Sequence, residues 1–340
     1  MAPKRQRSDA AAATEPPAGM RRSADRRPVV RRRTRLVRGP LTIGDPAPAI
    51  AARLATAEPY RADTLADGGE VFGLTVRAAS VRGLHKRYVG GPRQDDLCLR
   101  VHVDIRTLIV AVADGVTAAG RSDLGAALAV RHAAAAVARQ LEHGVVQVNW
   151  GDVFEHAAWA LVEEHRRTGL ADAGVGIEGA AGSLATTLTI AVISAPDGPG
   201  VSDLVDAGDR GDVDQDPVRV QLAAVGDSPA FVLVEGRFEP IVGEGEPVDG
   251  FVGGGVRALP RDPRAFCAGA CTLGPGSVLL VCTDGLALPL ADGAGEVGRT
   301  LARELASPPD IVDFARLLDF SRSTYDDDRT LIAVWPQRPQ

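Results

Sequence analysis

Aspartates follow or precede short apolar runs at several separate points of the 340-residue chain. An isolated aspartate in such a place usually caps a turn, because its carboxylate accepts hydrogen bonds from nearby backbone amides. Several of them gathered from different strand ends are instead typical of a site for Mg²⁺ or Mn²⁺, which are hard cations that prefer oxygen ligands. The segments concerned are Gln94-Asp95-Asp96, Ala113-Asp114-Gly115, Thr283-Asp284-Gly285 and Asp326-Asp327-Asp328, with Gly226-Asp227-Ser228 as a further member.

Other candidate metal ligands in the sequence fit a metal site less well. The insertion 195–217 is rich in aspartate, but it lacks the glutamate that ends an EF-hand loop, so we expect a mobile hairpin tip there rather than a calcium site. Cys267 and Cys271 stand at a CxxxC spacing without a histidine nearby, whereas Cys98 and Cys282 lie in apolar runs. We therefore expect buried or incidental thiols and no zinc site.

The spacing of apolar residues predicts the elements that must position these aspartates. An alternation with a period of two residues indicates a strand over 70–83, and further apolar runs predict strands at 97–103, 108–112, 183–194, 218–225, 230–234, 278–282 and 330–335. Helices are expected from Ser122 to a stop at Gly144, over 152–168, and after Ser307-Pro308. Hairpin-type neighbours outnumber strand–helix–strand units. This predicts an α+β fold with antiparallel sheets and outer helices rather than a doubly wound sheet.

Charge and composition divide the chain into three parts. Residues 1–40 hold twelve Arg or Lys against three acidic residues, although the whole chain has a net charge of −6. Because this basic stretch has no apolar periodicity, we expect residues 1–44 to be a disordered arm. Residues 45–69 are interpreted as a linker that wraps toward the domain, and 70–337 as that domain. Its acidic balance argues against nucleic-acid binding.

Features of secreted and membrane proteins are not found in the sequence. No run of about 18 apolar residues predicts a membrane span. Residues 1–44 also lack the apolar core of a secretory signal. We therefore expect a cytoplasmic protein.

Five motifs of this chain resemble, in order, the signature motifs of the PP2C (PPM) metal-dependent protein phosphatases, and the stretch from His85 to Asp95 is similar to a bacterial branch of that family. The resemblance covers about residues 72–336 and implies an α-β-β-α sandwich of two antiparallel sheets flanked by helix pairs. It also implies a centre with two Mg²⁺ or Mn²⁺ ions. The motifs are Ala113-Asp114-Gly115-Val116, Gly182-Ser183-Leu184-Ala185-Thr186-Thr187, Val225-Gly226-Asp227-Ser228-Pro229-Ala230-Phe231, Cys282-Thr283-Asp284-Gly285-Leu286 and Asp327-Asp328-Arg329-Thr330.

The resemblance also implies a role for each aspartate. Two cations about 3.5–4 Å apart lower the pKa of a water held between them and align it with a phosphoryl group. The resulting hydroxide attacks phosphorus directly, which fits a chain without a Cys-x5-Arg phosphate loop. The implied ligands are Asp114 bridging both metals, Asp284 and Asp327 on one, Asp95 and the Gly115 carbonyl on the other, and Asp227 near a third, weaker position.

The sequence departs from the common pattern of the family at the group that holds the phosphate. Gly90 stands where an arginine is expected, so Arg87 or Arg93 is predicted to serve as the clamp instead, and His85 is a candidate proton donor to the leaving oxygen. Leu288 occupies a position that is commonly aspartate. It is expected either to weaken a third metal position or simply to pack under the strand end.

Three functions remain in competition at this point. The first is a Mg²⁺- or Mn²⁺-dependent phosphatase that removes phosphate from serine or threonine of a protein, such as a Ser/Thr kinase or its target. The second is a pseudophosphatase that keeps the fold as a binding module and sequesters a kinase or regulatory partner. The third is a small-molecule phosphohydrolase. Retention of every primary metal aspartate favours the first.

Overall fold

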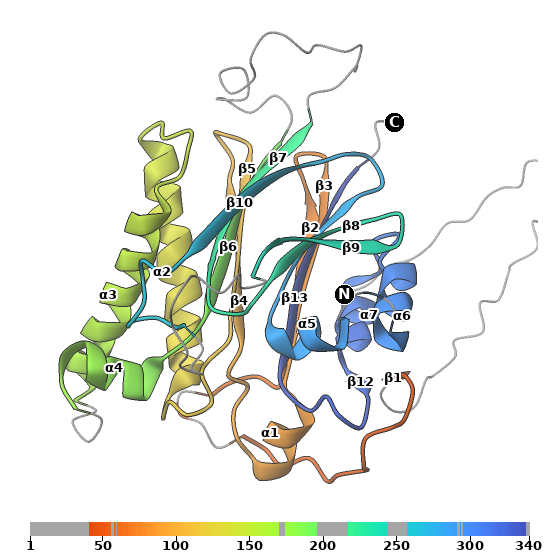
Figure 1. Ribbon diagram of the computed structural model, residues 1–340, viewed down its shortest axis with the longest axis horizontal. Coiled ribbons are helices and arrows are strands. Elements are labelled where there is room, and N and C mark those ends of the chain that lie inside the picture. Colours follow the sequence, from red (N-terminus) through yellow and green to blue (C-terminus); the bar gives the residue numbers. More distant parts are fainter. Residues whose placement is uncertain are drawn as a thin grey trace, which may run out of the picture. The chain divides into compact units, whose positions relative to one another are not determined.

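The computed structural model describes residues 41–55, 58, 60–169, 174–195, 217–243, 257–290, 293 and 295–337 (Figure 1). Most of the predicted arm and nearly all of the acidic insertion 195–217 lie outside the described residues. The last part of the predicted arm belongs to the fold, because β1 (Leu41–Thr42) pairs in parallel with β12 (Phe320–Ser321) and Ile43 is buried. The arm therefore ends earlier than expected.

Two antiparallel sheets form the centre of the fold. The first has five strands in the order β10-β7-β6-β5-β4, and the second has six in the order β2-β3-β13-β11-β8-β9. The strands of the first sheet are β4 (Asp96–His102), β5 (Thr107–Ala113), β6 (Leu188–Ser194), β7 (Val218–Val225) and β10 (Cys267–Leu273). Those of the second are β2 (Thr64–Val71), β3 (Leu74–Val81), β8 (Ala230–Val234), β9 (Arg237–Val242), β11 (Val278–Cys282) and β13 (Arg329–Pro336).

Helices cover the outer face of each sheet (Figure 1). The first sheet carries α2 (Ser122–Glu142) and α3 (Trp150–Thr168), with α4 (Gly176–Leu184) beside them. The second sheet carries α5 (Asp284–Leu290), α6 (Glu296–Glu304) and α7 (Ile311–Leu318), while the short α1 (Leu84–Val89) links β3 to β4. None of the described helices combines the length and apolarity needed to cross a bilayer.

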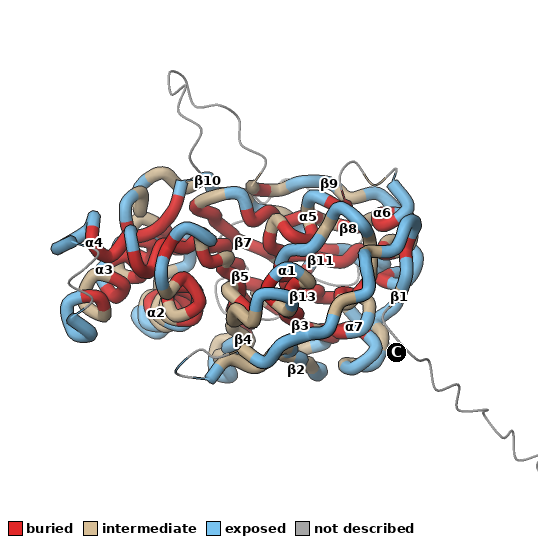
Figure 2. Tube along the Cα trace, turned by 90° about the horizontal axis from the view of Figure 1, so that it is seen from below, coloured by how far each residue is buried: buried red, intermediate tan, exposed pale blue. Residues whose placement is uncertain are grey.

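Three apolar clusters separate these four layers. One lies between the two sheets, a second between the five-stranded sheet and α2 and α3, and a third between the six-stranded sheet and α5, α6 and α7. Figure 2 shows the buried residues concentrated along the strands and on the inner faces of the helices. The α-β-β-α sandwich of antiparallel sheets that the sequence predicted is confirmed.

Some predicted elements were wrong in type or extent. The expected strand 183–194 begins instead as the end of α4, and β6 starts only at Leu188. The expected linker 45–69 contains most of β2, which pairs with β3 along its whole length. The structure therefore places the start of the sandwich before residue 70.

One end of the sandwich collects the chain segments that carry the candidate aspartates. β5, β7 and β11 end there, while β4 and β13 begin there. The pairing of Asp96 with Ala113 and of Cys282 with Leu331 fixes these strand ends side by side within each sheet. Antiparallel pairing thus brings residues far apart in the sequence to a common edge.

Close packing of α2 against α4 depends on Gly125. A methyl group on this residue would lie 2.0 Å from the Leu184 carbonyl oxygen. Although alanine is the better helix former by about 1 kcal/mol, we expect Gly125→Ala to lower the free energy of unfolding by about 1–3 kcal/mol through overpacking. Gly151→Ala in the first turn of α3, where the nearest atom is 3.4 Å away, is the control. Equal melting temperatures for the two variants would contradict this account.

Candidate metal centre

Carboxyl groups from three separate chain segments meet at this end of the sandwich. The Asp114 carboxyl group shares hydrogen bonds with those of Asp95 and Asp284. Asp95 directly precedes β4, Asp114 directly follows β5, and Asp284 opens α5 after β11. The strand ends therefore bring together three of the aspartates that the sequence singled out.

The Asp95 carboxylate is buried and hydrogen-bonded within the protein. This residue is 1% exposed, and its Oδ2 accepts hydrogen bonds of 2.7 Å from both the Thr283 and the Thr330 hydroxyl groups. Ser80 in turn shares a hydrogen bond of 2.6 Å with Thr330. Ser80 lies in β3, Thr330 in β13, and Thr283 directly after β11, so the six-stranded sheet fixes a carboxylate at the start of a strand of the other sheet.

Asp114 is held through its backbone, which leaves its carboxyl group available to the cluster. Its carbonyl oxygen accepts hydrogen bonds of 2.8 Å from the Thr186 hydroxyl and the Thr187 amide. Its own amide donates to the Thr187 hydroxyl at 3.1 Å. The next residue, Gly115, must be glycine because a Cβ atom there would lie 2.7 Å from the Ser122 carbonyl oxygen.

Crowding of these carboxyl groups changes their acidity. Burial, with the charge of Asp328 as the second cause, raises the pKa of Asp95 to about 7. Burial and the neighbouring Asp95 and Asp284 raise the pKa of Asp114 well above its usual range. Among the described residues, no three His, Cys, Asp or Glu side chains are arranged so that together they could coordinate one metal ion. The carboxyl groups instead lie in hydrogen-bonding contact with one another.

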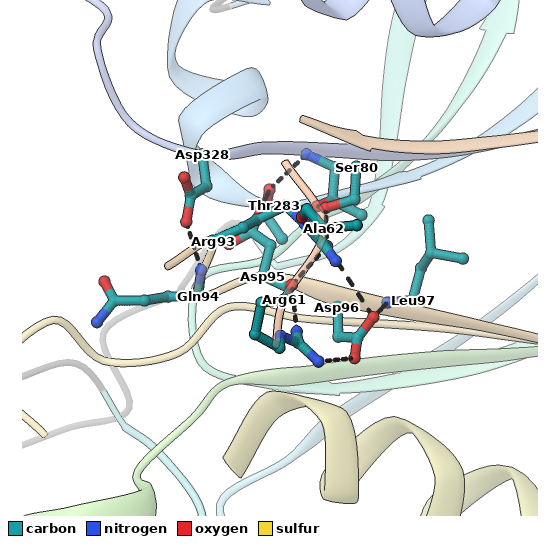
Figure 3. A network of polar contacts seen from close by, with 11 residues as sticks. Arg61, Ala62, Ser80, Arg93, Gln94, Asp95, Asp96, Leu97, Thr283 and Asp328 are labelled. Carbon is teal, nitrogen blue, oxygen red and sulfur yellow. Dashed lines mark hydrogen bonds and ion pairs between the residues drawn. The ribbon is translucent and has the colours of Figure 1, made fainter. Parts of the chain in front are cut away.

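Asp327 and Asp328 lie just before β13 and have different surroundings. Asp327 is exposed, and its Oδ1 accepts a hydrogen bond of 2.8 Å from the Asp328 amide. Asp328 is buried and accepts a hydrogen bond of 2.6 Å from the Gly83 amide and another of 2.6 Å from the Gln94 amide. Figure 3 shows the contact with Gln94. Asp328 therefore fixes both ends of the loop that contains α1 and leads to Asp95.

The sequence analysis linked Asp227 and Leu288 to a third metal position, Asp227 as a ligand and Leu288 in place of one. Burial of its carboxyl group and the neighbouring Asp284 raise the pKa of Asp227, so these two carboxyl groups lie close enough to repel each other. Leu288 is 64% exposed on α5. The interpretation that Leu288 packs under the strand end is therefore wrong, and its effect on a third metal remains a prediction.

The structure gives other partners to the two arginines that were expected to clamp a phosphate. Arg93 is 1% exposed, and its guanidinium group donates to the Ser80 hydroxyl, the Asp95 carbonyl and the Ala62 carbonyl. Because these protein acceptors already engage the Arg93 guanidinium group, it is not available to a substrate, and the clamp expectation for Arg93 was wrong. Arg87 forms ion pairs of 2.7 Å with Asp63 and with Asp319, and its role as clamp remains a prediction.

Lys86 was missed by the sequence interpretation. It belongs to α1 and is buried. Burial raises the pKa of Asp328, and the nearby Lys86 charge partly opposes that rise. Within the described part of the chain its ammonium group makes no hydrogen bond. Lysine occurs only twice in the whole sequence, at Lys4 and Lys86. A lysine so close to the first aspartate motif could have drawn attention to this position from the sequence alone. His85, the adjacent residue, is exposed.

Comparison with known proteins places this geometry in a family. A family model described as protein phosphatase 2C matches residues 82–309. A search of curated proteins found no match.

Among solved structures, the PPM Ser-Thr phosphatase MsPP from Mycobacterium smegmatis is 18% identical, with a TM-score of 0.44, and the match covers 78% of this chain and 99% of that one. Stp1 from Staphylococcus aureus is 14% identical, with a TM-score of 0.49 and coverage of 86% and 100%. PppA from Pseudomonas aeruginosa is 19% identical, with a TM-score of 0.45 and coverage of 78% and 98%. Because the family model matches more than half of its length, this chain belongs to the protein phosphatase 2C family.

Proposed function

We propose that this protein is a Mg²⁺- or Mn²⁺-dependent phosphatase that hydrolyses phosphoserine and phosphothreonine in proteins. The observation that carries the proposal is the contact of the Asp95, Asp114 and Asp284 carboxyl groups at the shared end of the two sheets. Membership of the protein phosphatase 2C family supports it. A phosphorylated Ser/Thr kinase or one of its target proteins is the expected substrate.

The chemistry of the donor set fits a pair of hard divalent cations. All the candidate ligand atoms are oxygens, which Mg²⁺ and Mn²⁺ prefer. Carboxyl groups whose pKa values are raised by burial and by mutual repulsion are stabilised in their charged form when a cation comes between them. The cluster therefore resembles a binding site more than a structural hydrogen-bond network.

Each residue of the cluster has a proposed place around the cations. Bound metal would polarise the phosphoryl group and lower the pKa of an attacking water. Thr283 and Thr330 would keep the Asp95 carboxylate in one orientation, and Thr186 and Thr187 would do the same for the Asp114 backbone. Asp114 would contribute to holding both metals, Asp284 and Asp327 would hold one, Asp95 and the Gly115 carbonyl would hold the other, and Asp227 would serve a third, weaker position.

Lys86 is the proposed phosphate-binding cation. A lysine ammonium group binds phosphate oxygens as a point charge, and hydrogen bonds between charged groups are stronger than those between neutral ones. Lys86 lies near Asp328, which directly follows Asp327 in the sequence. It also belongs to the loop that leads to Asp95. Arg87 and the exposed His85 on the same helix remain candidates for a clamp and a proton donor.

Substitution of the central carboxylates tests the enzyme assignment directly. Asp114→Asn or Asp284→Asn should abolish metal-dependent hydrolysis of a phosphopeptide, since each removes a charged ligand from the cluster. Asp313→Asn on the exposed side of α7 is the matched control. Unchanged turnover in either site variant would contradict the assignment. Metal binding by the wild type without hydrolysis would favour the pseudophosphatase, and faster turnover of a small phosphate ester than of a phosphopeptide would favour the phosphohydrolase.

A second kinetic test separates the candidate clamps. Loss of one charge-assisted hydrogen bond, about 1.5–3 kcal/mol, corresponds to roughly a 10–100-fold lower kcat/KM. We expect this loss for Lys86→Ala, with Mn²⁺ affinity retained and with partial rescue by Lys86→Arg. Arg87→Ala is the comparison variant. If Arg87→Ala had the larger effect on kcat/KM and Lys86→Ala had none, the clamp would be Arg87.

The raised pKa values predict how the stability of the metal-free protein depends on pH. Asp95, with a pKa of about 7 in the folded protein and about 3.9 when unfolded, binds its proton more tightly when folded. Stability from this group is therefore fully present below about pH 4 and is lost as the pH rises through 7. In EDTA, we expect the melting temperature to fall between pH 5 and pH 8.

Two controls accompany this measurement. Saturating Mg²⁺ at pH 8 should restore the melting temperature, because the cation stabilises the charged carboxylates. Asp95→Asn should show a shallower dependence on pH, because its amide cannot titrate. A melting temperature in EDTA that rises steadily from pH 5 to pH 8 would contradict the prediction.

A further inference from the structure

A short segment outside the family-matched range forms part of the wall of the metal centre. The family model begins at residue 82, whereas residues 60–63 precede β2 and run beside the loop that leads to Asp95 (Figure 3). We call residues 60–63 the strap. Its contacts with the site involve Arg61, Ala62 and Asp63.

Arg61 holds the peptide that joins Asp95 to Asp96. Its Nη1 donates to Asp96 Oδ2 at 3.0 Å, and its Nη2 donates to the Asp95 carbonyl oxygen at 3.2 Å. Both side chains of this ion pair are buried, with exposures of 11% for Arg61 and 5% for Asp96. A planar guanidinium group with two such acceptors fixes orientation as well as distance, which a lysine cannot do.

The rest of the strap reinforces this contact. The Ala62 carbonyl accepts a hydrogen bond of 3.3 Å from Arg93, whose Nη1 donates to the same Asp95 carbonyl oxygen at 2.7 Å. Asp63 pairs with Arg82 at 3.0 Å and with Arg87 at 2.7 Å. Two guanidinium groups thus meet at one backbone oxygen of Asp95, and the strap supplies one of them directly and a partner for the other.

These contacts leave the Asp95 backbone little freedom. Its carbonyl is held from the strap side, while its carboxylate accepts hydrogen bonds from Thr283 and Thr330 on the opposite side. If the Arg61 contacts were lost, the Asp95–Asp96 peptide could rotate and turn the carboxylate away from the cluster. Partners that orient a metal ligand in this way typically change metal affinity by about 10–100-fold.

We propose that Arg61 is a positioning residue of the metal centre, which aims the Asp95 carboxylate at the cations although it lies outside the matched family range. The proposal rests on the proposed function in one respect, namely that Asp95 is a metal ligand. It extends the functional site to the strap.

Calorimetric titration of the EDTA-stripped full-length protein with Mn²⁺ tests this role without depending on catalysis. We expect Arg61→Ala to weaken Mn²⁺ binding about tenfold or more, and Arg61→Lys to weaken it less because it keeps the charge opposite Asp96. The melting temperature of each metal-free variant is measured alongside. A merely structural role would lower that temperature without changing Mn²⁺ affinity in the folded protein.

Arg77→Ala provides the matched control. Arg77 lies on β3 and donates to the Pro309 and Val76 carbonyl oxygens, so its loss also removes two hydrogen bonds but leaves the loop to Asp95 untouched. This variant should bind Mn²⁺ as the wild type does. If Arg61→Ala does not fold, Arg61→Lys carries the test, with an expected several-fold loss of affinity.

The outcomes separate this inference from the proposed function. Wild-type Mn²⁺ affinity in the folded Arg61 variants would overturn the positioning role. A wild-type protein that binds Mn²⁺ but hydrolyses no phosphopeptide would overturn the phosphatase proposal, while weaker binding in Arg61→Ala would still support the positioning role. A wild-type protein that does not bind Mn²⁺ would overturn both.

Discussion

Mutual repulsion among buried carboxyl groups is the constraint on which the arrangement of this protein depends. Asp95, Asp114 and Asp284 are in contact, and burial together with neighbouring carboxylates raises the pKa of the first two. Such a cluster persists only where the surrounding framework prevents the groups from moving apart. The framework here comprises two paired sheets, threonine hydroxyl groups, and a set of guanidinium groups held by the strap.

Close backbone contacts allow the two sheets to deliver their carboxylates to one place. A Cβ atom on Gly83 would lie 2.3 Å from the Asp327 carbonyl carbon, and one on Gly285 would lie 2.0 Å from the Asp328 carbonyl oxygen. These glycines let the α1 loop and the start of α5 approach the residues before β13. A side chain at either position would push apart two of the segments that carry these aspartates, so the carboxyl cluster depends on the small residues as much as on the charged ones.

Sequence patterns were sufficient for the sandwich and for the aspartates, but not for the contacts that support them. Strands β8 and β11 follow from unbroken apolar runs, and β7 from apolar residues that first alternate with Arg219 and Gln221 and then run on to Val225. β2 was missed because its sequence, TLADGGEV, is that of a mostly exposed edge strand with little apolar alternation. Arg61 and Lys86 were missed for a different reason: a long-range hydrogen bond or a buried charge leaves no periodic trace in the chain.

The position of β13 has a consequence for the synthesis of this protein. This strand lies between β3 and β11 in the middle of its sheet, and its Thr330 holds the Asp95 carboxylate. While the chain emerges from the ribosome, β3 and β11 therefore have no common neighbour, and Asp95 lacks one of its two hydroxyl partners. The hydrogen bonds of the Asp95 carboxylate therefore cannot be completed until β13 has been made. A chain that ends before residue 329 would therefore lack both the strand between β3 and β11 and the Thr330 contact with Asp95.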